Sequence, residues 1–137
     1  MGAPHVWLKA AIEAAASGVT AWPVEAGDVA PPYVIYGREG TTREQLLDDT
    51  FDEDPEPDEI PPVARFTVVI YADSYVQAWE ISGAVAAAIH RFKGSAEGQT
   101  IDHCLVLDER DGEAIYLDGR EQPTYTVEQS VEIRFQE

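Results

Sequence analysis

The chain has 137 residues, with 26 acidic and 9 basic side chains, a formal net charge of −17 and a single cysteine, Cys104. This length fits one domain, spanning 1–137, that needs no disulfide or metal to fold, and one cysteine excludes an intrachain disulfide. A field this negative repels phosphate, which argues against general binding to nucleic acid or anionic membrane. We also expect no signal peptide and no membrane-spanning segment.

The N-terminal part of the chain predicts one helix and two strands. Apolar residues recur with helical spacing from Pro4 to Ser17, which predicts a helix capped at Gly18. A short strand is predicted from Trp22 to Glu25. Two prolines then lead into Tyr33–Arg38, a run rich in β-forming residues that predicts a second strand.

The segment from Asp48 to Glu59 holds eight acids and no base, contains two prolines and is followed by Pro61 and Pro62. Proline blocks both a helix and a central strand, and like charges at this density repel each other. We therefore predict an extended, solvated loop between two strands, because the acid spacing is not that of a calcium-binding EF-hand loop. The acids of this loop are Asp48, Asp49, Asp52, Glu53, Asp54, Glu56, Asp58 and Glu59.

The middle of the chain predicts a strand followed at once by a helix. Val63–Ala72 carries apolar groups on both faces, which is typical of a central strand. Ser74 and Gln77 have the spacing of a capping box, in which each side chain accepts a backbone N–H at the start of a helix. We expect this helix to end at Gly94.

The C-terminal part predicts three strands. Ile101–Asp108 is followed by a turn and by a short return strand at Ala114–Leu117. Tyr125–Phe135 alternates apolar and polar residues, and its length leads us to expect that one end extends past the sheet to meet a neighbour. The order of elements predicts an α+β domain, with a mostly antiparallel β-sheet and two α-helices packed on one face.

The sequence shows no pattern of catalytic or ligand-binding residues. His5, His90 and His103 are dispersed without the spacing of metal ligands. Cys104 follows His103 and suggests a thiol–base pair, but neighbouring residues in a strand point to opposite faces. We therefore predict no catalytic residue, no metal and no cofactor, and expect that the protein is not an enzyme.

Several segments, taken in order, resemble one known family. They are the helix near the N-terminus, the run Ala30–Tyr36, the junction Ile70–Ala78 in which a strand leads directly into a helix, and the Tyr-containing last strand Tyr125–Phe135. This order is similar to that of the tail-completion, or tail-terminator, proteins of long-tailed bacteriophages and related prophages. The resemblance covers nearly the whole chain, and its most specific parts are the Pro-Tyr-Val strand and the strand-to-helix junction.

The resemblance implies a structural virion protein. Members of the family form a hexameric ring on the head-proximal end of the tail tube, where the ring ends tube polymerisation and joins the tail to the head connector or neck proteins. It implies assembly in the bacterial host cytoplasm, a homo-hexamer that contacts the tail tube protein, and no membrane partner. DNA would pass through without specific binding, and an acidic lumen would reduce its adhesion.

Closure of a ring requires a heterologous interface, in which one patch of a subunit meets a different patch on the next. Our candidates are the edge of the strand at 33–38 and the end of the last strand: Tyr33, Ile35, Tyr36, Arg38, Val131, Ile133, Arg134 and Phe135. The alternative is an acidic inhibitor or DNA mimic that binds a basic partner. The two differ in oligomeric state, because a mimic would usually be a monomer or dimer.

Overall fold

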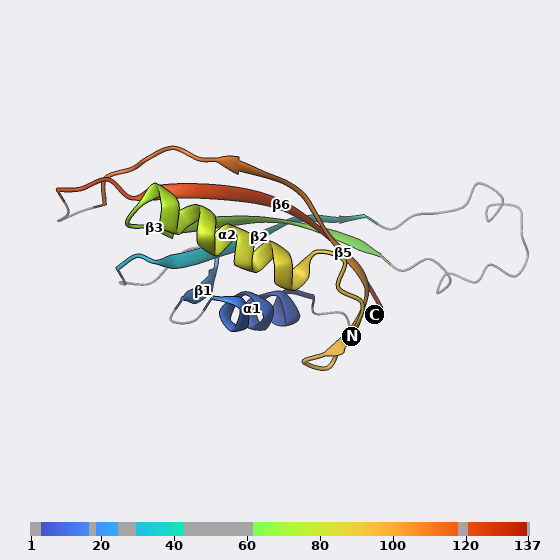
Figure 1. Ribbon diagram of the computed structural model, residues 1–137. Helices are drawn as coiled ribbons and strands as arrows, with labels where there is room; N and C mark the ends of the chain where they lie inside the picture. The colour runs from blue at the N-terminus through green and yellow to red at the C-terminus, as the bar shows by residue number, and fades with distance from the viewer. Residues whose placement is uncertain (1–3, 17–18, 25–29, 43–61, 118–120, 137) are drawn as a thin grey trace, which may run out of the picture.

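The computed structural model describes residues 4–16, 19–24, 30–42, 62–117 and 121–136, and Figure 1 shows their arrangement. Within these residues, the helices α1 (Pro4–Ala15) and α2 (Tyr75–Ile89) lie on one face of a six-stranded sheet. The α+β class, with a mostly antiparallel sheet and two helices on one face, is therefore confirmed. No helix among these residues is long and apolar enough to cross a membrane.

The sheet has the strand order β1-β2-β3-β6-β5-β4. The first pair, β1 and β2, is parallel, and every other pair is antiparallel. The strands are β1 (Thr20–Pro23), β2 (Tyr33–Thr42), β3 (Val63–Ala72), β4 (Gly94–Ala96), β5 (Gln99–Asp111) and β6 (Tyr125–Phe135).

The core lies between the two helices and the inner face of the sheet. β3 and β6 form its centre, because alternate residues of each strand turn towards the helices and exclude water. Burial of this apolar surface is the main favourable contribution to folding. The fully buried side chains include Leu8 and Ile12 of α1, Phe66, Val68 and Ile70 of β3, Val85 and Ile89 of α2, and Val131 and Ile133 of β6.

The start of α2 follows the predicted capping pattern. Ser74 Oγ accepts the N–H of Gln77 at 3.1 Å, and Gln77 Oε1 accepts a backbone N–H in return, that of Asp73 at 3.0 Å. The same end of the helix is fastened to β5, since the Asp111 carboxylate accepts from Trp79 Nε1 at 2.8 Å and from the Tyr75 hydroxyl at 3.2 Å.

The predictions for the end of the second helix and for the return strand are wrong. α2 ends at Ile89 instead of Gly94, because His90 leaves the helical conformation with ψ 124° and Arg91 has a positive φ of 66°. Gly94 instead begins β4. The return strand at residues 114–117 is also absent: Ile115 makes an isolated bridge to Thr124, and β5 itself continues as far as Asp111.

Candidate assembly surfaces

β2 has no free edge over Tyr33–Tyr36, so the interface prediction is wrong for the edge of these residues, whereas beyond Tyr36 the described residues place no strand on the β1 side of β2. β1 pairs with it over Tyr33–Tyr36 on one side, and β3 pairs with it on the other. Tyr33 and Tyr36 are buried, and Tyr33 stacks on Tyr71 with 4.7 Å between ring centroids. Burial is the main cause that raises the pKa of both Tyr36 and Tyr71, so both phenols stay protonated at neutral pH. Ile35 is partly exposed.

The last strand does not extend beyond the sheet. β6 is paired with β3 from Tyr125 to Arg134 and with β5 from Val127 to Phe135. Three of the predicted interface residues on this strand are therefore core residues, namely Val131, Ile133 and Phe135, whose exposed fractions are 1%, 0% and 2%.

Two arginines among the predicted interface residues remain partly exposed. The Arg38 guanidinium lies 5.5 Å from the ring centroid of Phe66 and 6.0 Å from that of Phe135, so its position closes one end of the core. Arg134 is partly exposed on β6. Contact of Ile35, Arg38 or Arg134 with a second subunit stays a prediction, and the acidic segment from Asp48 to Glu59 lies outside the described residues.

Cys104 has the properties of a core residue and not of a nucleophile. Its side chain is 0% exposed, and desolvation by burial raises the pKa of the thiol to about 12. The reactive thiolate is therefore scarce at neutral pH. His103 lies on the opposite face, where its Nε2 is 3.7 Å from a Glu132 carboxylate oxygen. The described residues contain no group of His, Cys, Asp and Glu that could hold a metal ion.

The outer face of the sheet, opposite the helices, carries paired charges. Arg65 lies 3.5 Å from the Glu132 carboxylate, across the β3–β6 pair. Arg110 contacts Asp108 at 2.8 Å and Glu128 at 3.8 Å, across the β5–β6 pair. Such exposed pairs contribute little to stability, typically below about 1 kcal/mol each. With two arginines against three carboxylates, these pairs offset part of the negative charge of this face.

β5 has an edge that no strand covers for most of its length among the described residues. β4 pairs only with Gln99–Ile101, whereas β6 pairs with the other side of β5 as far as Asp111. Two backbone groups of β5, near the end that β4 covers, form hydrogen bonds with the segment after α2. Cys104 O accepts from Arg91 N at 2.6 Å, and Val106 N donates to His90 Nδ1 at 3.0 Å. We call the edge from Asp102 to Asp111 the open edge.

The register of β5 against β6 shows which backbone groups point away from β6 at the end of the open edge near Asp111. The β6 residues that bond to β5 are even-numbered, as the bond from Gly112 N to Thr126 O shows. Glu109 and Asp111 lie opposite the odd-numbered Gln129 and Val127. Because backbone groups alternate in direction along a strand, the N–H and C=O of Glu109 and Asp111 point away from β6.

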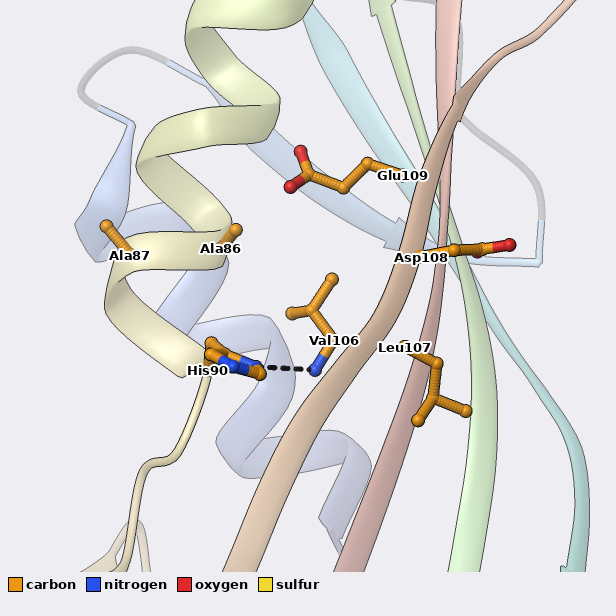
Figure 2. A pocket seen from close by; sticks show the side chains of 7 residues that line it. All are labelled: Ala86, Ala87, His90, Val106, Leu107, Asp108 and Glu109. Atoms are coloured by element: carbon orange, nitrogen blue, oxygen red, sulfur yellow. Dashed lines mark hydrogen bonds between the residues drawn. The ribbon is translucent and has the colours of Figure 1, made fainter.

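A groove of about 520 Å³ runs beside the open edge, between α2 and β5, and Figure 2 shows the side chains that line it. Two small residues of the helix, Ala86 and Ala87, form one wall, and the bulge in β5 at Leu107 contributes to the other. Leu107 is 50% exposed, which is unusual for so large an apolar side chain. The lining is completed by His90, Val106, Asp108 and Glu109.

A buried polar network underlies the groove. Ser82 of α2 donates from Oγ to Glu109 Oε2, and Gln129 of β6 donates from Nε2 to Ser82 O at 3.0 Å and to Ser82 Oγ at 2.9 Å. Gln129 and Ser82 are both 0% exposed. The network fixes the position of α2 over β5 and β6 and orients the Glu109 carboxylate along the groove wall.

The sequence pattern did not reveal the open edge or the groove. Both features depend on the segment that follows α2, in which His90 and Arg91 are no longer helical and form hydrogen bonds with the β5 backbone. A positive φ at a non-glycine residue such as Arg91 has no clear sequence signature.

The sequence matches no protein-family model and no curated protein. Among solved structures, a chain in the "Virion of native gene transfer agent (GTA) particle" has a similar fold, with a TM-score of 0.57 and 16% sequence identity. The similarity covers 92% of this chain and 84% of that chain. At this identity it is a likeness of fold, and it extends over nearly all of both chains.

Proposed function

We propose that this protein is a structural component of the virion of a bacteriophage or phage-related particle. The observation that carries the proposal is the fold shared with a chain of a gene transfer agent virion over 92% of the present chain. The resemblance of the sequence to phage tail-terminator proteins supports the same kind of role. The strand-to-helix junction, one of the most specific parts of that resemblance, buries Ile70, Ala72 and Ala78 in the core where β3 leads into α2 and leaves Tyr75 and Val76 exposed.

Within this class, we propose the role of tail terminator. In this role six copies form a ring on the head-proximal end of the tail tube, stop its polymerisation and offer a surface to the neck proteins. The negative charge of the chain suits a ring through which DNA passes, because carboxylates repel phosphate and do not retain it. The role requires a stable protein scaffold and no chemical step.

The decisive experiment is negative-stain imaging of purified tail tubes that polymerise in the presence and absence of this protein. We expect tubes of limited length, each with a ring at one end, when the protein is present, and longer tubes without rings when it is absent. Identical length distributions would contradict the terminator role. The control is the same protein unfolded by heat and cooled before addition, which separates capping from an effect of added polyanion.

Sedimentation velocity distinguishes the alternative of an acidic inhibitor. That alternative predicts a monomer or dimer that displaces DNA from a basic protein. The terminator role predicts a hexamer, or a monomer that becomes a ring only on the tube end, and no displacement of DNA. Displacement of DNA by the free monomer, together with unchanged tubes, would favour the inhibitor.

A further inference from the structure

We propose that the open edge of β5 and the adjoining α2–β5 groove bind a basic, extended segment of another protein, which adds to the sheet as a further strand. This inference does not rest on the tail-terminator role, because it is drawn from this chain's own backbone edge, groove and charges.

The first requirement for strand addition is an unpaired backbone edge. Past Val106, the described residues place no strand on the side of β5 that faces away from β6. The backbone N–H and C=O groups of Glu109 and Asp111 point outward on this side. A partner strand would bond to these groups in the way that peptides add to the sheet edges of other domains. Natural proteins usually cover or shorten such an edge, so an edge of this length calls for an explanation.

The second requirement is room and apolar contact for the partner's side chains. A strand beside β5 would direct alternate side chains towards α2, into the groove in Figure 2. Ala86 and Ala87 leave space there because they end at Cβ. Leu107, half exposed at the bulge, points to the other side of β5 in Figure 2, where it offers an apolar contact to the partner's remaining side chains.

The charge of the edge selects the partner. Asp108, Glu109, Asp111 and Glu113 follow one another along or just past the open edge, and Arg110 is held by Asp108 and Glu128. These carboxylates would attract lysine or arginine on an incoming strand and repel an acidic one. A second copy of this chain is a poor occupant, because it carries 26 acids against 9 bases and presents the same acidic edge.

The charge is also asymmetric, which orients the partner. His90, Arg91 and Lys93 lie at the end near β4, whereas the acids lie at the far end, from Asp108 onward. We therefore expect the partner's basic residues to lie beside the end of β5 that leads to Gly112.

The test uses the full chain and a synthetic peptide of alternating lysine and valine as the probe. Binding is followed by isothermal titration, and the site is mapped by amide chemical shifts. We expect shifts at residues 106–111 of β5 and at residues 86–90, which comprise the end of α2 and His90. Two control peptides are expected not to bind: one with glutamate in place of lysine, and one with N-methylated backbone amides that cannot pair with an edge.

The variant Leu107→Lys places a positive charge beside the open edge, on the side of β5 away from α2 and at an exposed position, so the fold should be retained. The matched control is Val24→Lys, which makes the same charge change at a 77% exposed position after β1, at the opposite edge of the sheet. We expect Leu107→Lys to weaken peptide binding about tenfold or more through charge repulsion and lost contact, and Val24→Lys to leave it nearly unchanged.

Three results would overturn the proposal. In the first, the N-methylated peptide binds as well as the probe, which would mean that charge alone attracts it. In the second, Leu107→Lys and Val24→Lys weaken binding equally. In the third, sedimentation shows that the chain self-associates and that only Leu107→Lys prevents this, which would make a second copy the occupant. Tube capping is measured separately, so a failed peptide test leaves the proposed function standing.

Discussion

Replacement of the buried Gln129 by leucine should leave the protein about as stable as before. The Gln129 side chain is 0% exposed, and its two N–H groups bond to Ser82. Its oxygen, Oε1, has no hydrogen-bond partner among the described residues. The hydrogen-bonded N–H groups stabilise the fold and the unpaired oxygen destabilises it, so their contributions to the free energy of unfolding nearly cancel.

The size of the stability change depends on whether the groups that bond to Gln129 keep other hydrogen bonds after the substitution. Gln129→Leu removes two hydrogen bonds of about 1 kcal/mol each, but it also removes a desolvated oxygen that costs about 1–3 kcal/mol. Both Ser82 atoms keep a hydrogen bond, because the Oγ hydroxyl still donates to Glu109 and the carbonyl still accepts the helical N–H of Ala86. We expect the free energy of unfolding to change by less than about 1 kcal/mol.

Urea unfolding followed by circular dichroism, at one fixed protein concentration, measures this change. The control is Ile133→Ala on the same face of β6, which is fully buried and should cost about 2–5 kcal/mol through lost burial and a cavity. If Gln129→Leu costs as much as this control, the reasoning is refuted, and the amide must stabilise the fold beyond its two bonds to Ser82.

Three further predictions concern the helix cap, the thiol and an ion pair. Ser74→Ala should lower the free energy of unfolding by about 1 kcal/mol, as measured by urea titration, because the N–H of Gln77 loses its acceptor. Iodoacetamide should label Cys104 only in the unfolded protein, since burial raises its thiol pKa to about 12, and rapid labelling of the native protein would contradict this. The hydrogen bond from Lys9 lowers the pKa of Glu13 below its usual 4.5, so its contribution is present above that pH and is lost as the pH falls through the lowered pKa. Glu13→Gln should therefore reduce the stability difference between about pH 7 and about pH 3, by less than about 1 kcal/mol because the side chain is one-third exposed.

The sequence predicted the central strands of the sheet better than the short edge strands and the end of the second helix. Val63–Ala72 and Tyr125–Phe135 appear with the predicted bounds, because both strands are long and their apolar pattern reflects burial directly. The capping residue Ser74 also behaves as predicted, since a helix N-cap is a local device that needs no tertiary contact.

The short edge strands and the end of α2 depend on tertiary contacts that cannot be read from the sequence. β1 and β4 have four and three residues, too few for a periodic pattern to identify their partners. Yet the parallel pairing of β1 is what covers β2 over Tyr33–Tyr36 and removes these residues as an interface edge. Similarly, the end of α2 is set by His90, whose ring bonds to the β5 backbone 16 residues later in the chain.

The corrected positions of β2 and β6 change how a ring of these subunits would close. Every copy in a ring presents the same surfaces, so a heterologous contact must bring one of them to a different one. β6 is paired on both sides and β2 is paired on both sides over Tyr33–Tyr36, which leaves two unpaired stretches in the described part of the sheet: the β1 side of β2 from Gly37 to Thr42 and the longer open edge of β5. Its carboxylates disfavour contact with the same edge of another copy. If the ring forms, we expect closure through side-chain surfaces such as those bearing Arg38 and Arg134, and we expect Leu107→Lys to leave ring formation intact while it weakens binding of the basic strand.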